Sequence, residues 1–221
     1  AQQMIRIFDG IPFTEVCVHI PKRRRTLIGA VGIAGGKIRF SIPQKSIGCP
    51  GCRTPEGTGE AVFVDLQKRT GGKMKTTMVF LSIEKDTARW MHVGDSRLYI
   101  FRDGKKVFQT ADHSVSYMAV LMGEITIDQI RFHEDRNRVL RALGGENAKP
   151  EVSEPRKLED GQYAFLLCTD GFWEYVREPE MEQTLAEAKN PDAWIRSMEK
   201  ILLTRVGADN DNYTAAAVFC R

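Results

Sequence analysis

The stretch from Trp90 to Phe101 reads WMHVGDSRLYIF and places an acidic motif between two apolar runs. Apolar, β-branched and aromatic residues fill both runs, a composition typical of buried β-strands. Asp95 therefore lies where one predicted strand ends and the next begins. A carboxylate in that position lies at the edge of a sheet.

Two further carboxylates occupy the same kind of position. Asp170 follows the apolar run 166–168, and Asp211 precedes the strand-like run 213–219. We expect Asp95, Asp170 and Asp211 to converge at one edge of a sheet. Mg²⁺ and Mn²⁺ prefer carboxylate, carbonyl and water oxygens, and a pair of such ions can activate water and neutralise charge on a phosphoryl group. The three motifs therefore predict a divalent metal site.

The order and surroundings of these motifs resemble the metal-dependent protein phosphatase family, the protein phosphatase 2C-like Ser/Thr phosphatases, in its bacterial form. Several motifs in the expected order, over roughly two thirds of the chain, are far more specific than one short pattern. The resemblance covers residues 76–221, with Glu134 where the family has Pro. Its blocks are Thr76-Thr77 with the strand-like run 78–83, His92 to Tyr99, Arg102 to Lys105, Asp112-His113-Ser114, Gly123-Glu124-Ile125, His133 to Gly145, Leu166 to Gly171, and Asp211 to Thr214.

The resemblance implies a site and a reaction. Asp170 and Asp211 would ligate a pair of Mn²⁺ or Mg²⁺ ions, Asn212 would orient Asp211, and Asp95 would serve a third ion. A metal-activated water would hydrolyse phosphoserine and phosphothreonine in phosphorylated proteins, within a Ser/Thr kinase pathway. A metal nuclease or other phosphoesterase would use the same ligands, but the sequence lacks the basic and aromatic surface expected of a nucleic-acid enzyme.

Residues 1–75 are the atypical part of the chain. Family members carry there an Arg, an Asn-Glu-Asp-like stretch and an Asp-Gly-Met-Gly-Gly-like turn whose Asp bridges the two metals, and this sequence has no good copy of them. The nearest candidates are residues 31–35, with Val31 in place of the Asp, and Asp9, which follows the strand-like run 4–8. If the bridging carboxylate is lost, the alternative function is a catalytically impaired phosphatase-like module for regulation or interaction.

Some of these residues also have a plainer interpretation. Asp95 could pair with Arg97 as an ordinary ion pair. Asp209 lies close enough to Asp211 to compete for its role. We expect His113 and His133 to be hydrogen-bonded structural groups rather than general acids.

Composition indicates one cytoplasmic domain spanning residues 1–221, and we expect a monomer. The chain is 42% hydrophobic, long enough to bury a core, and its 32 basic and 29 acidic residues give a net charge of only +3. Nothing in this balance favours nucleic acid, and no apolar run is long enough to span a membrane. We expect Cys17, Cys168 and Cys220 to be core residues and the pair Cys49 and Cys52 to flank a turn. The start at Ala1 suggests a fragment or a processed chain.

The predicted fold class is α+β, an antiparallel β-sandwich flanked by helices in α-β-β-α layers, with one helical layer incomplete. Residues 78–108 predict an antiparallel meander with a tight hairpin at Asp103-Gly104. We expect a flap at 125–134 between two short helices. The expected helices are 114–122, 137–143 and 192–206, the last beginning at Asn190-Pro191, and further N-terminal strands are expected at 15–20 and 37–42.

Overall fold

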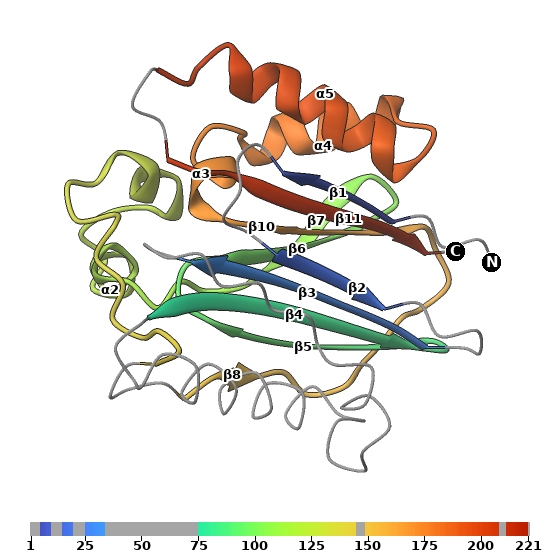
Figure 1. The fold of residues 1–221 in the computed structure, drawn as a ribbon, viewed down its shortest axis with the longest axis horizontal. Helices are drawn as coiled ribbons and strands as arrows, with labels where there is room; N and C mark the ends of the chain where they lie inside the picture. The colour runs from blue at the N-terminus through green and yellow to red at the C-terminus, as the bar shows by residue number, and fades with distance from the viewer. Residues whose placement is uncertain are drawn as a thin grey trace.

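The computed structural model describes residues 5–9, 15–19, 25–33, 75–144, 149–207 and 211–220, the first three ranges as backbone only. Two antiparallel sheets make up the fold (Figure 1). The five-stranded sheet has the order β1 (Ile5–Asp9), β11 (Thr214–Cys220), β10 (Tyr163–Cys168), β6 (Arg97–Arg102) and β7 (Lys105–Gln109). The six-stranded sheet has the order β2 (Glu15–His19), β3 (Arg25–Ile33), β4 (Thr76–Glu84), β5 (Thr87–Val93) and β8 (Glu151–Val152), with β9 (Arg156–Lys157) also paired to β5.

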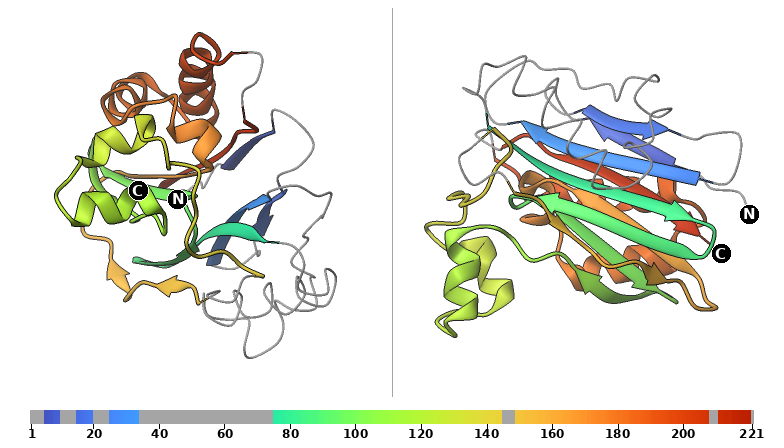
Figure 2. Two further views of the ribbon diagram at one scale, coloured as in Figure 1. Left: turned by 90° about the vertical axis from the view of Figure 1, so that its left-hand side faces the viewer. Right: turned by 90° about the horizontal axis from the view of Figure 1, so that it is seen from below.

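Helices cover one side of this sandwich. α4 (Glu178–Glu187) and α5 (Pro191–Leu203) lie over the outer face of the five-stranded sheet, and α5 contacts β11 and β1 (Figures 1 and 2). α2 (Val115–Leu121), the 3₁₀ helix η3 (Ile127–Phe132) and α3 (Asp170–Trp173) lie toward one end of the sheets. The predicted α+β sandwich is confirmed. Among the described residues, no helix is long and apolar enough to cross a membrane.

Strand alternation builds two core layers, as the two-residue period of a strand requires. Along β10, Phe165 and Leu167 face the six-stranded sheet, whereas Leu166 and Cys168 face the helices. Trp194 of α5 is fully buried against Phe101 of β6. Burial raises the pKa of the Cys168 thiol, which keeps it neutral in this layer, as predicted for a core cysteine.

The expected meander is wrong in one respect. β4 and β5 form a hairpin in the six-stranded sheet, but β6 and β7 form theirs in the other sheet. The chain therefore crosses between the sheets at Gly94 to Ser96. Gly94 has φ +100°, and a Cβ there would lie 2.3 Å from the Thr77 side chain, so the crossing requires glycine.

The helix expected at 137–143 is also wrong. Val139 and Leu143 instead form isolated bridges with Ser114 and Thr76. The Leu143 N–H donates to the Thr76 carbonyl at 2.8 Å, and Thr76 donates back at 3.0 Å. The segment therefore ties the α2 and η3 region to the sandwich.

The helices at α2 and α5 were predicted correctly, because each carries a capping signal. Ser114 Oγ accepts from the Tyr117 N–H, and Asn190 Oδ1 accepts from the Ala193 N–H. α4 was not predicted. The expected strand at 37–42, Cys49, Cys52 and Asp209 lie outside the described residues.

Candidate metal centre

The end of β10 and the start of β11 are joined beside the interface between the sheets. The Thr169 N–H donates to the Thr214 carbonyl at 3.1 Å, and the Thr214 N–H donates to Thr169 Oγ1 at 3.0 Å. Gly171 packs so closely on the same segment that a Cβ would lie 2.4 Å from the Asn212 carbonyl oxygen. These contacts place the first turn of α3 against the residues that precede β11.

Asp170 opens α3 at this junction. Its Oδ1 accepts from the Gly171 N–H at 2.9 Å. Burial raises the pKa of Asp170, and the nearby charge of Asp211 raises it further. The two carboxyl groups are therefore close enough to repel one another.

Asp95 joins them from the crossing between the sheets. It is 5% exposed, and its carbonyl oxygen accepts from Trp173 Nε1 at 2.9 Å, so a side chain of α3 holds the crossing in place. Burial raises the pKa of Asp95 well above its ordinary value, and the charges of Asp170 and Asp112 add to the rise. The structure thus brings Asp95, Asp170 and Asp211 into one electrostatic group. Their role as metal ligands stays a prediction.

Arg97 forms its ion pair with Asp112 rather than with Asp95, and its charge is only a small cause that lowers the pKa of Asp95. Its guanidinium binds both carboxylate oxygens of Asp112, with Nε at 2.8 Å and Nη2 at 2.6 Å. It also lies over the Trp173 ring and donates to the Tyr99 hydroxyl at 3.0 Å. The plain interpretation of Asp95 as the ion-pair partner of Arg97 is therefore wrong.

Glu174 is an additional carboxylate that we did not predict. Its side chain is 12% exposed, and both of its oxygens lie 3.3 Å from Arg136 Nε. Burial raises the pKa of Glu174, and among the smaller causes Arg136 lowers it whereas Asp170 and Asp211 raise it. Glu174 follows Asp170 by four residues, the spacing that places two side chains on one helix face, and that spacing was the available signal.

The acidic cluster, defined as Asp95, Asp112, Asp170, Glu174 and Asp211, offers the oxygen donors of a divalent-cation site. Asp95 and Asp170 are shielded from water beside other carboxylates and therefore need a cation or a proton, and the arginine ion pairs of the described part of the chain engage Asp112 and Glu174 rather than these two. An all-oxygen donor set suits Mg²⁺ or Mn²⁺.

Asn212 makes one observed contact with the cluster. Its main-chain N–H donates to Asp211 Oδ1 at 2.8 Å. Both residues are exposed. The contact orients the Asp211 carboxylate through the backbone, and a role for the Asn212 side chain stays a prediction.

The two N-terminal candidates are placed by backbone register. Asp9 pairs with Thr214, three residues after Asp211, so the end of β1 lies at the metal-site end of its sheet. Val31 pairs with Met78, which in turn pairs with Val93, and it lies inside β3 rather than in a turn. The side chains of both residues lie outside the described part, so neither prediction is decided.

Among the described residues, the group of potential ligands whose atoms lie within 4.8 Å of one another is His92, His113 and Glu151, and no three carboxylates of the acidic cluster meet that distance. His92 Nε2 lies 2.8 Å from the Ala111 carbonyl oxygen, and His113 Nδ1 accepts from the Gly94 N–H at 3.2 Å. His113 Nε2 therefore carries the ring proton of the neutral side chain and faces Glu151 at 3.3 Å. The two rings are stacked with 10° between their planes, so their in-plane lone pairs do not converge on one ion. His113 is a structural hydrogen-bonding group, as predicted, and His133 likewise accepts from the Asp135 N–H.

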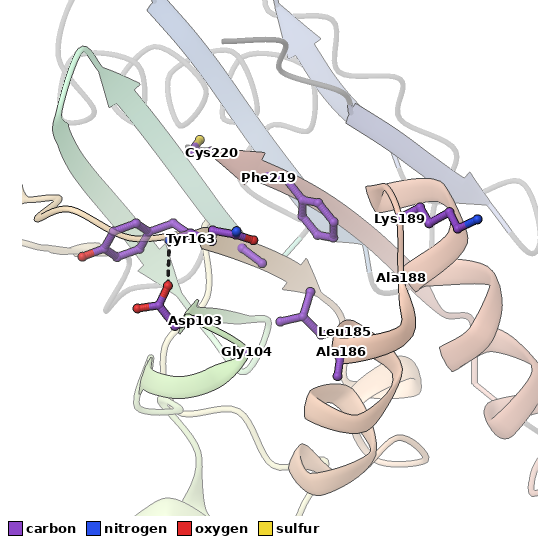
Figure 3. A pocket seen from close by; sticks show the side chains of 11 residues that line it. Asp103, Gly104, Tyr163, Leu185, Ala186, Ala188, Lys189, Phe219 and Cys220 are labelled. Atoms are coloured by element: carbon purple, nitrogen blue, oxygen red, sulfur yellow. Dashed lines mark hydrogen bonds between the residues drawn. The ribbon is translucent and has the colours of Figure 1, made fainter.

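A cavity of about 300 Å³ lies at the opposite end of β10 from Asp170. Asp103 and Tyr163 line it from the sheet, and Leu185 and Lys189 line it from α4 and the residues after it (Figure 3). The length of β10, at roughly 3.3 Å per residue, separates it from the acidic cluster. The cavity is not part of the metal centre.

The raised pKa of Asp95 predicts a pH dependence of the metal-free protein. The folded state binds more protons than the unfolded state once the pH exceeds the ordinary carboxyl value of 3.8, so the free energy of unfolding falls as the pH rises through the folded-state pKa. Thermal unfolding in chelator between about pH 5 and pH 8 should show a smaller fall in Tm for Asp95→Asn than for the unchanged protein. The lowered pKa of His113 acts in the opposite direction but equally in both proteins. Parallel Tm curves would contradict the prediction.

The layered sandwich of two antiparallel sheets with flanking helices is a fold that solved bacterial phosphatases share. A bacterial serine phosphatase has the same fold, with a TM-score of 0.78 at 18% identity over 100% of this chain and 98% of that one. The catalytic domain of the phosphatase PstP, solved with two manganese ions, aligns with a TM-score of 0.68 at 19% identity over 100% and 98%.

Sequence comparison finds relatives among bacterial protein phosphatases. A protein phosphatase 2C-type protein of Streptococcus pyogenes is 29% identical over 146 residues, and the Ser/Thr phosphatase PstP of Mycobacterium tuberculosis is 30% identical over 142 residues. The chain is similar to bacterial protein phosphatases of the 2C type and to bacterial Ser/Thr phosphatases. The matches cover 66% and 64% of this chain but only 58% and 26% of those proteins. No model of a known protein family matches the chain.

Proposed function

We propose that the protein is a metal-dependent phosphatase that hydrolyses phosphoserine and phosphothreonine in proteins. The observation that carries this proposal is the acidic cluster, in which residues from three distant segments lie near one another, so that the charge of Asp170 raises the pKa of Asp95 and the charge of Asp211 raises the pKa of Asp170. Similarity to bacterial protein phosphatases and the names of these relatives support the reaction class, and the two manganese ions of the PstP domain support Mn²⁺ as the cofactor.

In the proposed mechanism, bound Mn²⁺ or Mg²⁺ supplies a water of lowered pKa and positive charge for the phosphoryl oxygens. Asp170 and Asp211 would hold the ions from the start of α3 and from the residues before β11. Asp95 would hold a third ion from the crossing between the sheets. Trp173 fixes the Asp95 backbone, and the Thr169 and Thr214 hydrogen bonds fix the spacing of the segments that carry the other two, which would preorganise these carboxylates as ligands.

A calorimetric Mn²⁺ titration combined with hydrolysis of a phosphoserine peptide tests the proposal. We expect two-site binding and Mn²⁺-dependent release of inorganic phosphate. Asp9→Asn should weaken Mn²⁺ binding if Asp9, at the metal-site end of β1, supplies the bridging carboxylate. Weak single-site binding without hydrolysis by the folded protein would favour the catalytically impaired regulatory module instead.

A further inference from the structure

Arg136 lies in the segment between η3 and the Val139 bridge, where local hydrogen bonds hold the backbone. The Arg136 N–H donates to the His133 carbonyl at 3.2 Å, and the Arg138 N–H donates to the Asp135 carbonyl at 3.0 Å. The Asp135 N–H donates to His133 Nδ1 at 3.1 Å. The Arg136 side chain therefore projects from a fixed turn rather than from an open loop.

The guanidinium of Arg136 contacts the acidic cluster through its Nε atom, which faces the Glu174 carboxylate. Its Nε lies 3.3 Å from both oxygens of Glu174, whose pKa responds to the charges of Asp170 and Asp211. A guanidinium carries five N–H donors, and Nε uses one. Within the described residues, no hydrogen bond engages the terminal amino groups of Arg136, and its side chain is 37% exposed. Donors therefore remain available at the rim of the cluster.

Two other arginines near the acidic cluster are buried and already form ion pairs with carboxylates. Arg97 is 1% exposed and binds Asp112 with two nitrogens. Arg131 reaches Glu178 at 2.6 Å and is also buried. Arg136 differs from both because it is anchored to a cluster carboxylate and still open to solvent.

We propose that Arg136 binds the phosphoryl oxygens of the substrate, with Glu174 as the positioning residue that aims its guanidinium. A planar guanidinium donates two parallel hydrogen bonds to a phosphoryl group, which a point charge cannot do. This proposal rests on the proposed function, since it names the group that holds the phosphoryl group which the metal centre would cleave.

The test measures inorganic phosphate binding by calorimetry in the presence of Mn²⁺, Mn²⁺ binding alone, and hydrolysis of a phosphoserine peptide. Arg136→Ala should weaken phosphate binding and raise KM by roughly 10- to 100-fold, the range expected for hydrogen bonds to a charged group. Arg136→Lys should recover only part of the loss, because lysine restores charge but not the paired donors. Arg138→Ala is the matched control, since Arg138 is 69% exposed and pairs with Asp135.

The results separate the role of Arg136 from the proposed phosphatase function. Full recovery in Arg136→Lys, or unchanged phosphate affinity in Arg136→Ala with altered Mn²⁺ affinity, would show that Arg136 merely neutralises Glu174 and would overturn the inference. Phosphate binding that depends on Arg136 in a chain without hydrolysis would support the inference and overturn the proposed function. Hydrolysis that is unchanged in Arg136→Ala would support the proposed function and overturn the inference. A folded chain that neither binds phosphate nor hydrolyses the peptide would overturn both.

Discussion

Asp170→Asn should abolish Mn²⁺-dependent hydrolysis of p-nitrophenyl phosphate while leaving the fold intact. The substitution removes one charged oxygen ligand, and because loss of an outer-shell partner alone costs about 10- to 100-fold in metal affinity or activity, loss of the ligand should cost roughly 100-fold or more. Asparagine retains the oxygen that accepts from the Gly171 N–H. The first turn of α3 should therefore persist.

The stability of this variant in chelator provides an independent measurement. Burial and the charge of Asp211 raise the pKa of Asp170, so the ionised group costs stability near neutral pH when no cation is bound. Asp170→Asn should therefore have an equal or higher Tm than the unchanged protein without metal, and a lower Tm gain on adding Mn²⁺. Asp103→Asn is the control, because Asp103 lies in the β6–β7 turn and lines the distant cavity. Retained activity in folded Asp170→Asn would end its assignment as a ligand.

Sequence patterns predicted the elements whose signals are local. α5 follows from Asn190 and Pro191 at its start and from an apolar stripe that includes Trp194 and Met198, both fully buried. The hairpin at Asp103 follows from an Asp-Gly pair with positive φ at both residues. In each case the residues that signal the element also make its stabilising contacts.

The wrong predictions depend on contacts far along the chain. Val139 and Leu143 have the four-residue spacing of a helix face, yet their backbones bridge to Ser114 and Thr76. The strands before and after Gly94 are equally apolar, and no local property says that they belong to different sheets. The arrangement depends on the pairing of Arg97 with Cys168, 71 residues along the chain.

The candidate site divides in the same way. Asp95, Asp170 and Asp211 could be predicted as candidates because each lies where an apolar run ends or begins. The four-residue spacing from Asp170 was a signal for Glu174, but it does not distinguish Glu174 from a surface glutamate, because what marks Glu174 is its contact with Arg136. The sequence therefore indicated three carboxylates of the acidic cluster, but it did not indicate Arg136, whose guanidinium contacts Glu174.

Gly171→Ala should damage the metal centre without changing a ligand. An added Cβ would lie 2.4 Å from the Asn212 carbonyl oxygen and 3.0 Å from the Asn212 carbonyl carbon, and backbone atoms cannot rotate away as a flexible side chain can. The segment that carries Asp211 must therefore move away from α3. Overpacking of this kind costs about 1–3 kcal/mol, and each kcal/mol lowers the Tm by roughly 2–4 °C in a chain of this size.

The functional loss should exceed the loss of stability, because a shift of about 1 Å in one ligand is enough to impair a preorganised site. Calorimetry should show weakened Mn²⁺ binding at a temperature where circular dichroism shows the variant folded. Gly207→Ala is the matched control, since a Cβ there meets no atom within 4 Å. Equal Mn²⁺ affinity of folded Gly171→Ala and folded Gly207→Ala would contradict this prediction. In that case the close packing of α3 on the Asp211 segment does not position a metal ligand. Another carboxylate of the acidic cluster would then have to replace Asp211 as the candidate.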